Sequence, residues 1–211
     1  MLSEKDLHIL KKQLGRMPRG VVAIAVRHKD RTPVVTVNYP LHHEDAPHIP
    51  HIHEHSPCPE KLVPFPTLFW LTCPVLHRKL ADLERRGQID HLQNHINHNA
   101  ELEHTLTEDH KSYIDLRWRL MNKDDQQAAL ESPCLLETLR ARGIGGISNF
   151  LTLKCLHLHY AHHLANLPQG GTTVGRLLEA DNPQLIDIRN QFITEPLAKL
   201  FPLPPGSPPM P

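Results

Sequence analysis

Hydrophobic positions in the first forty residues change from a helical to an extended period. Between residues 3 and 15, leucines recur every three or four positions, with a serine before them as the N-cap and a glycine after them as the stop. Two apolar, β-rich runs follow at 21–26 and 34–39, separated by a short polar stretch. This pattern predicts an amphipathic helix followed by a two-stranded hairpin.

A long segment without any period comes next. Residues 40–64 contain six prolines and, between positions 42 and 55, six histidines. We interpret this segment as a surface loop rich in histidine and proline. The run at 65–72 is short, aromatic and apolar, and it predicts a third strand.

Helical spacing dominates the rest of the chain. Apolar residues recur every three or four positions over 74–86 and over 88–141. The glycines at 143–146 interrupt this pattern, which resumes over 150–165 and again between 183 and about 200. We therefore predict an α+β fold in which a small antiparallel sheet packs against a larger helical layer.

Length and composition bound the organisation of the chain. The 211 residues suffice for one core of ordinary size, so we expect a single α+β domain over residues 1–200. The last segment, 201–211, contains six prolines and one glycine, which is typical of a disordered or polyproline tail.

Charge and hydropathy argue against two classes of partner. Lys and Arg total 23 and Asp and Glu total 23, so the chain lacks the excess positive charge of a dedicated nucleic-acid binder. No apolar stretch approaches the roughly 20 residues that a membrane crossing requires, and the first residues lack an apolar leader. We expect a cytoplasmic protein without a membrane partner, whose small-molecule or protein partner the sequence does not identify.

Histidine is the anomaly of the composition, with 18 residues, and its densest cluster is Cys-Leu-His-Leu-His-Tyr-Ala-His-His at 155–163. Thiolate and imidazole are the ligands that zinc prefers. If a helix begins before Cys155, then Cys155, His159 and His162 share one face. If it begins near His157, Cys155 could instead join His157 and His162. The alternative to either metal site is that these histidines cover a solvated helix face.

Cys73 is the second candidate for chemistry. It precedes Pro74, which is favoured at the first position of a helix, so the thiol falls at or next to an N-cap. The positive end of the helix dipole favours a thiolate there, which could ligate a metal or act as a nucleophile. The more ordinary role is that of a small buried hydrophobe. Cys58 and Cys134 have no neighbouring ligand pattern, and we interpret them as structural.

Two weaker features carry charge or ligands. The histidines between 42 and 55 could bind zinc or nickel weakly, but a proline-rich loop does little to preorganise them. Arg16, Arg19 and Arg27 surround the first predicted strand and could supply positive charge, although isolated arginines usually serve as surface solubilisers.

Three separated motifs, in order along the chain, are similar to those of one bacterial protein family. They are Leu14-Gly15-Arg16 with Pro18-Arg19-Gly20-Val21-Val22, then Phe65-Pro66-Thr67-Leu68-Phe69-Trp70-Leu71-Thr72-Cys73-Pro74, then Gly145-Gly146-Ile147 with Lys154-Cys155-Leu156-His157 and Ala161-His162. The chain resembles DUF501, a family of unknown function, from roughly Leu14 to Arg176. The resemblance implies the ligand set Cys155, His157 and His162, and it leaves His159 outside the motif.

Our leading hypothesis is that Cys73, Cys155, His157 and His162 converge on one transition metal ion, with zinc as the expected ion. Two thiolates and two imidazoles complete the tetrahedral sphere of a structural site. If water displaces one histidine, the same site could activate that water for hydrolysis. An iron–sulfur cluster is a lesser variant, since its usual ligands are four cysteines.

Two alternatives belong to other functional classes. The first is a metal-free thiol enzyme with Cys73 as nucleophile and His157 or His162 as base. The second is a non-catalytic interaction module that uses the proline tail or the histidine-rich loop. The sequence does not decide whether the protein is an enzyme.

Overall fold

The computed structural model describes residues 2–43 and 62–201. The predicted tail at 202–211 and the middle of the histidine-rich loop, 44–61, lie outside these residues. A four-stranded antiparallel sheet has the strand order β5-β2-β1-β6. Its strands are β1 (Val21–His28), β2 (Pro33–Asn38), β5 (Phe69–Leu71) and β6 (Phe192–Thr194).

Strand β2 lies between two partners and is buried along its whole length. Because side chains alternate across a strand, Val35 and Val37 point to one face of the sheet and Thr36 and Asn38 to the other. The valines belong to the main hydrophobic core, which also contains residues of helix α7 (Leu156–Ala165). The opposite face of β2 therefore carries two buried polar side chains.

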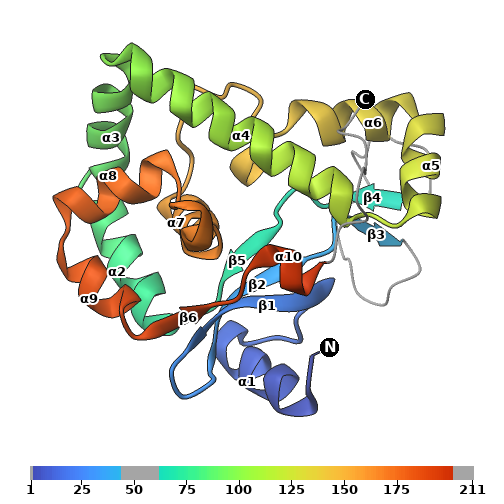
Figure 1. The fold of residues 1–211 in the computed structure, drawn as a ribbon, viewed down its shortest axis with the longest axis horizontal. Coiled ribbons are helices and arrows are strands. Elements are labelled where there is room, and N and C mark those ends of the chain that lie inside the picture. The colour runs from blue at the N-terminus through green and yellow to red at the C-terminus, as the bar shows by residue number, and fades with distance from the viewer. Residues whose placement is uncertain (1, 44–61, 202–211) are drawn as a thin grey trace.

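Helices make up most of the remaining chain, and the predicted α+β class is confirmed. Helix α1 lies on one side of the sheet and the larger helical layer lies on the other (Figure 1). The further helices are α1 (Glu4–Leu14), α2 (Pro74–Arg85), α3 (Gln88–Asn97), α4 (Ala100–Leu120), α5 (Lys123–Glu131), α6 (Pro133–Ala141), α8 (Thr173–Asp181), α9 (Gln184–Arg189) and α10 (Leu197–Leu200).

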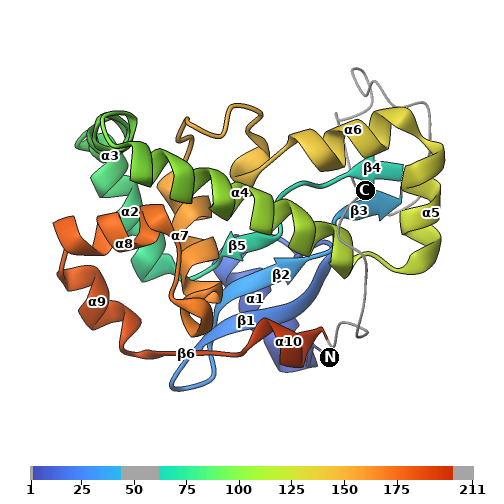
Figure 2. The same cartoon turned by 45° about the horizontal axis from the view of Figure 1, so that its top comes forward.

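Helix α7 occupies the centre of the helical layer. It packs on β5 and against α2 and α8, and both views show it enclosed between these elements (Figures 1 and 2). Nearly every one of its side chains is buried, including His159, His162 and His163. The interpretation that these histidines cover a solvated helix face is therefore wrong, because the helix has almost no solvated face.

A second, smaller hydrophobic cluster joins the ends of the predicted loop to the helices. Strands β3 (Leu41–His43) and β4 (Leu62–Pro64) pair with each other and pack beside α6. The phenol of Tyr39, between β2 and β3, donates a hydrogen bond to the carboxylate of Asp125 and so links this part of the chain to α5. The predicted loop 40–64 thus begins and ends in paired strands.

Two element boundaries differ from the prediction. The predicted helix from 183 to about 200 is interrupted by β6, which pairs with the free edge of β1. Long-range pairing overrides the local helical period because an unpaired edge leaves its backbone groups without partners. Helix α7 begins only at Leu156, since residue 155 is extended, with φ −157° and ψ 124°.

Candidate metal centre

Two packed helices bring the candidate ligands together. Glu84 lies in the last turn of α2, Cys155 is the N-cap of α7, and His157 lies in the first turn of α7. Leu80 of α2 and Leu156 of α7 are both fully buried in the main hydrophobic core, in which α2 packs against α7, and this shared burial holds the two helices together.

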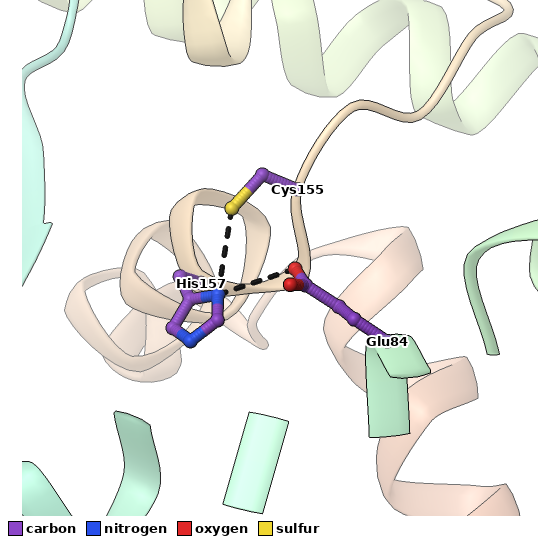
Figure 3. Close-up of side chains that lie close together, drawn as sticks. All are labelled: Glu84, Cys155 and His157. Carbon is purple, nitrogen blue, oxygen red and sulfur yellow. Dashed lines mark hydrogen bonds and ion pairs between the residues drawn. The ribbon is translucent and has the colours of Figure 1, made fainter. Parts of the chain in front are cut away.

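The donor atoms of these three side chains converge. Cys155 Sγ lies 3.5 Å from His157 Nδ1, and the same nitrogen lies 3.2 Å from Oε1 of Glu84 (Figure 3). The sulfur, the ring nitrogen and the carboxylate oxygen all lie within 4.8 Å of one another. Within residues 2–43 and 62–201, Glu84, Cys155 and His157 form the one group of three or more His, Cys, Asp or Glu side chains whose donor atoms lie this close together.

The orientation of the His157 ring is set by its other nitrogen. Nε2 lies 3.0 Å from the backbone carbonyl oxygen of His77 in α2, and this oxygen can only accept a hydrogen bond. The partner therefore assigns the proton to Nε2. The ring also packs on the imidazole of His77, with 4.3 Å between the centroids. Nδ1 is left facing Cys155 and Glu84.

Glu84 has a local structural role as well. Its Oε1 accepts a hydrogen bond from the backbone N–H of Leu156, at 2.6 Å. That N–H belongs to the first turn of α7, whose N-cap, Cys155, makes no side-chain capping bond. The carboxylate of Glu84 thus supplies from another helix the acceptor that an N-cap side chain normally provides.

The surroundings change the protonation of His157. Burial alone lowers the pKa of its imidazole, because it disfavours the charged form. Contacts with Cys155, the carbonyl of His77 and the carboxylate of Glu84 outweigh burial and raise this pKa to about 9. The point between Nδ1, the sulfur and the carboxylate therefore favours positive charge.

Cys73 does not join this group. It is the N-cap of α2, partly buried against the main core, whereas Glu84 lies at the other end of the same helix. Eleven residues of helix correspond to a rise of roughly 16 Å between these two positions. The predicted N-cap position of Cys73 is confirmed, but the thiol lies one helix length away from the carboxylate that faces His157.

His162 also lies apart from the group, inside the core. Its ring stacks on Phe69, with 5.5 Å between centroids and 7° between planes, and meets the edge of Tyr113 at 5.0 Å. Burial, reinforced by neighbouring histidines, lowers the pKa of His162 to about 3. Of the four ligands expected from the sequence, the structure brings together Cys155 and His157.

His162 lies in a buried group of histidines, whose burial the sequence analysis did not predict and whose member His110 it did not name. His110, His159 and His163 are each at most 2% exposed. His110 and His159 each have a ring nitrogen without a hydrogen-bond partner among the described residues, whereas Nε2 of His163 lies 3.4 Å from Oε1 of Glu179. Two of these residues follow one another closely on α7, but His110 comes from α4 and no local pattern points to it.

Glu84 was missed as well, and no signal in the sequence could have found it. It is one of several charged residues near the end of α2, and 71 positions separate it from Cys155. Among the other predicted candidates, Cys134 packs beside the second cluster, and Cys58 lies outside the described residues with most of the 42–55 histidines.

Fold and site together define an α+β protein with a Glu, Cys and His group at the junction of two core helices. Residues 24–180 match the model of DUF501, described as a protein of unknown function. The chain belongs to this family, which confirms the resemblance inferred from its motifs. The first of those motifs, at 14–22, precedes the matched residues.

Other comparisons give no relative. No curated protein and no solved structure matches the chain. Within the part of the chain that the structure describes, no helix has both the length and the apolar character needed to cross a bilayer.

Proposed function

We propose that this protein binds a transition metal ion, with zinc the best fit, through Glu84, Cys155 and His157. The observation that carries the proposal is the convergence of three donor atoms of different chemistry within 4.8 Å. Thiolate, imidazole and carboxylate are all zinc ligands. The proposal keeps two of the residues expected from the sequence and exchanges Cys73 and His162 for Glu84.

Two of the three separations between the donor atoms agree with a tetrahedral ion. Bonds of about 2.3 Å to sulfur and about 2.05 Å to nitrogen, at the tetrahedral angle, place these two ligands about 3.6 Å apart. The same construction gives about 3.3 Å between nitrogen and oxygen ligands. The measured values are 3.5 Å for Cys155 to His157 and 3.2 Å for His157 to Glu84.

The surroundings of the two ring nitrogens of His157 provide a second argument. Nε2 donates to the His77 carbonyl, and the raised pKa of the ring indicates that the position at Nδ1, 3.2 Å from a carboxylate oxygen, favours a bound cation. A metal ion would replace the Nδ1 proton at that position. A metal-bound histidine typically donates its other ring N–H to a carbonyl or carboxylate, and the His77 carbonyl has that role here.

The number of ligands favours an open site. Three protein ligands leave a fourth position on a tetrahedral ion, which is the arrangement of catalytic zinc sites, whereas structural sites use four protein ligands. A zinc ion held in this way would supply an activated water for hydrolysis. A thiolate ligand persists best in a reducing compartment, so a cytoplasmic location is part of the proposal.

Cobalt substitution tests the ligand set directly. A thiolate bound to Co²⁺ gives a near-ultraviolet charge-transfer band that imidazole sites lack, so the many histidines of this chain do not interfere. We expect the band in the wild-type protein and its loss in Cys155→Ser. Glu84→Gln keeps an oxygen that can accept the Leu156 N–H, so it removes the ligand charge while preserving the cap, and we expect at least tenfold weaker binding.

Cys73→Ser and His162→Leu are the matched controls, because both residues lie in the core near α2 and α7 without joining the group. We expect both variants to retain the cobalt band at full intensity. Persistence of the band in Cys155→Ser would refute the proposed site. Its loss in Cys73→Ser would restore Cys73 as a ligand and refute the revised set.

The same contacts favour a second candidate, a metal-free thiol enzyme. A cysteine 3.5 Å from an imidazole that faces a carboxylate is the arrangement of an activated nucleophile, its base and an orienting group. In this version the nucleophile is Cys155 and not Cys73. Rapid alkylation of Cys155 by iodoacetamide at pH 6 in metal-free and zinc-treated protein alike would favour the thiol enzyme; protection by zinc favours the metal site. The third class, an interaction module, stays a prediction.

A further inference from the structure

A cavity of about 180 Å³ lies on the face of the sheet that α7 does not cover. Its walls come from the end of α1 and the following segment, from β1 and β2, and from the β3 to β5 region. The side chains used below are Arg16, Arg19, Thr36, Asn38, Phe65 and Trp70. None of them belongs to the proposed metal centre.

The floor of the cavity is polar although it is buried. Thr36 is 1% exposed and Asn38 is 4% exposed, and both belong to the central strand β2. The Thr36 hydroxyl lies 3.4 Å from Asn38 Oδ1, and among the described residues no hydrogen bond is formed by the amide nitrogen of Asn38. Because Asn38 lines the cavity, this amide has donors to offer to a molecule there.

The rim of the cavity is positively charged. Arg16 and Arg19 both line it, and within residues 2–43 and 62–201 no acidic residue does. Among the described residues, neither arginine forms an ion pair with a carboxylate, whereas Arg27 on the same sheet is paired with Asp6. Two unpaired guanidinium groups beside a cavity provide the donors and the charge that recognise a carboxylate or phosphate.

One wall of the cavity is aromatic. The rings of Phe65 and Trp70 lie 6.5 Å apart at 23°, and the edge of the His42 ring packs on Phe65 at 4.7 Å. Gly20 allows the His42 ring to approach closely, because a Cβ at this glycine would lie 2.5 Å from Cε1 of His42. Flat apolar surfaces of this kind favour planar ligands.

The size of the cavity limits the ligand. A cavity of about 150 Å³ in another protein holds one benzene molecule. The volume of about 180 Å³ here therefore admits one six-membered ring with a small acidic group at the open rim. Dinucleotides and peptides are too large.

We propose that this cavity binds a small aromatic anion, a single planar ring bearing a carboxylate or phosphate. The ring would pack against Trp70, the acidic group would lie between Arg16 and Arg19, and a polar ring substituent would meet Thr36 and Asn38. The proposal is independent of the metal site, which is formed by α2 and α7.

Tryptophan fluorescence can report occupancy, because Trp70 lines the cavity and the chain has one other tryptophan, Trp118. In a Trp118→Phe background, we expect saturable changes on titration with phenyl phosphate or benzoate. Benzyl alcohol tests the ring without the charge, and inorganic phosphate tests the charge without the ring. We expect both to bind at least tenfold more weakly than the better aromatic anion.

Variants identify the groups that bind. Arg16→Gln combined with Arg19→Gln should weaken the better aromatic anion at least tenfold, since each charge-assisted contact is worth about tenfold or more. Arg140→Gln, at an exposed arginine on α6, should leave binding unchanged. Thr36→Val preserves the shape of the buried floor and should weaken binding if the fold, followed by circular dichroism, is retained.

Four outcomes would overturn the proposal. They are no saturable response to either aromatic anion, equal affinity for benzyl alcohol, equal affinity for inorganic phosphate, and unchanged affinity in the double arginine variant. The absence of any saturable response would exclude the binding site. Equal affinity for benzyl alcohol would exclude recognition of an acidic group, and equal affinity for inorganic phosphate would exclude recognition of an aromatic ring. Unchanged affinity in the double variant would exclude a role for the two arginines.

Discussion

Replacing His162 by leucine should make the protein less sensitive to acid. His162 is 4% exposed, and its Nδ1 has no hydrogen-bond partner among the described residues. Burial first, and then the neighbouring histidines, lower its pKa to about 3 in the folded protein. In the unfolded chain the pKa returns to about 6.5. Below pH 6.5 the unfolded state therefore binds more protons, and the free energy of unfolding falls as the pH falls.

The size of the effect follows from these two pKa values. At pH 7.5 the unfolded chain gains less than about 0.1 kcal/mol from protonating His162, and at pH 5.5 it gains about 1.4 kcal/mol. Between these conditions His162 alone reduces the free energy of unfolding by about 1.4 kcal/mol, which corresponds to an average uptake on unfolding of about half a proton over the two pH units. Leucine has a similar volume and does not titrate, so His162→Leu should remove this part of the pH dependence.

Urea denaturation at pH 7.5 and at pH 5.5 gives the free energy of unfolding that each protein loses over this interval. The effect of His162 is the difference between the loss in wild type and the loss in the variant. The comparison matters because His157, whose pKa is raised, changes stability in the opposite direction in both proteins and cancels. His95→Leu, at an exposed histidine on α3, is the control and should leave the pH dependence unchanged. If His162→Leu loses as much stability as wild type, His162 is not neutral in the core and the reasoning fails.

Three further predictions concern the stability of the fold. Tyr39→Phe removes the donor to Asp125, a residue only 7% exposed, and should cost about 1–3 kcal/mol in urea unfolding; wild-type stability would show that this hydrogen bond has no net value. The buried side chain of Arg117 donates hydrogen bonds to three backbone carbonyl groups, and Arg117→Leu would leave these groups without that donor. The melting temperature should therefore fall by several degrees, and an unchanged melting temperature would contradict this reasoning. Gly20→Ala introduces a side chain at φ 60° that meets His42, so we expect about 1–3 kcal/mol of destabilisation and weaker benzoate binding; full retention of both would contradict the described packing.

Local patterns were sufficient wherever a structural element depends on its own residues. The first helix begins at Ser3 in a capping box and ends at Gly15 in a left-handed conformation, as its serine and glycine predicted. The hairpin of β1 and β2 followed from two β-rich runs joined by a short turn. Cys155 and His157 also meet through local geometry, since two positions at a helix start place their side chains within contact.

Only the tertiary structure could decide which distant residues face each other. Whether Cys73 or Glu84 meets His157 depends on how α2 lies along α7, and both residues sit on the same helix. The inward direction of His162 follows from the burial of α7 on almost every side, which its own period does not reveal. β6 forms because β1 has a free edge, and the polar floor of the cavity is recognisable only once the two faces of β2 are assigned. These features depend on packing between segments far apart in the chain, where hydrophobic burial and unpaired backbone groups outweigh local preference.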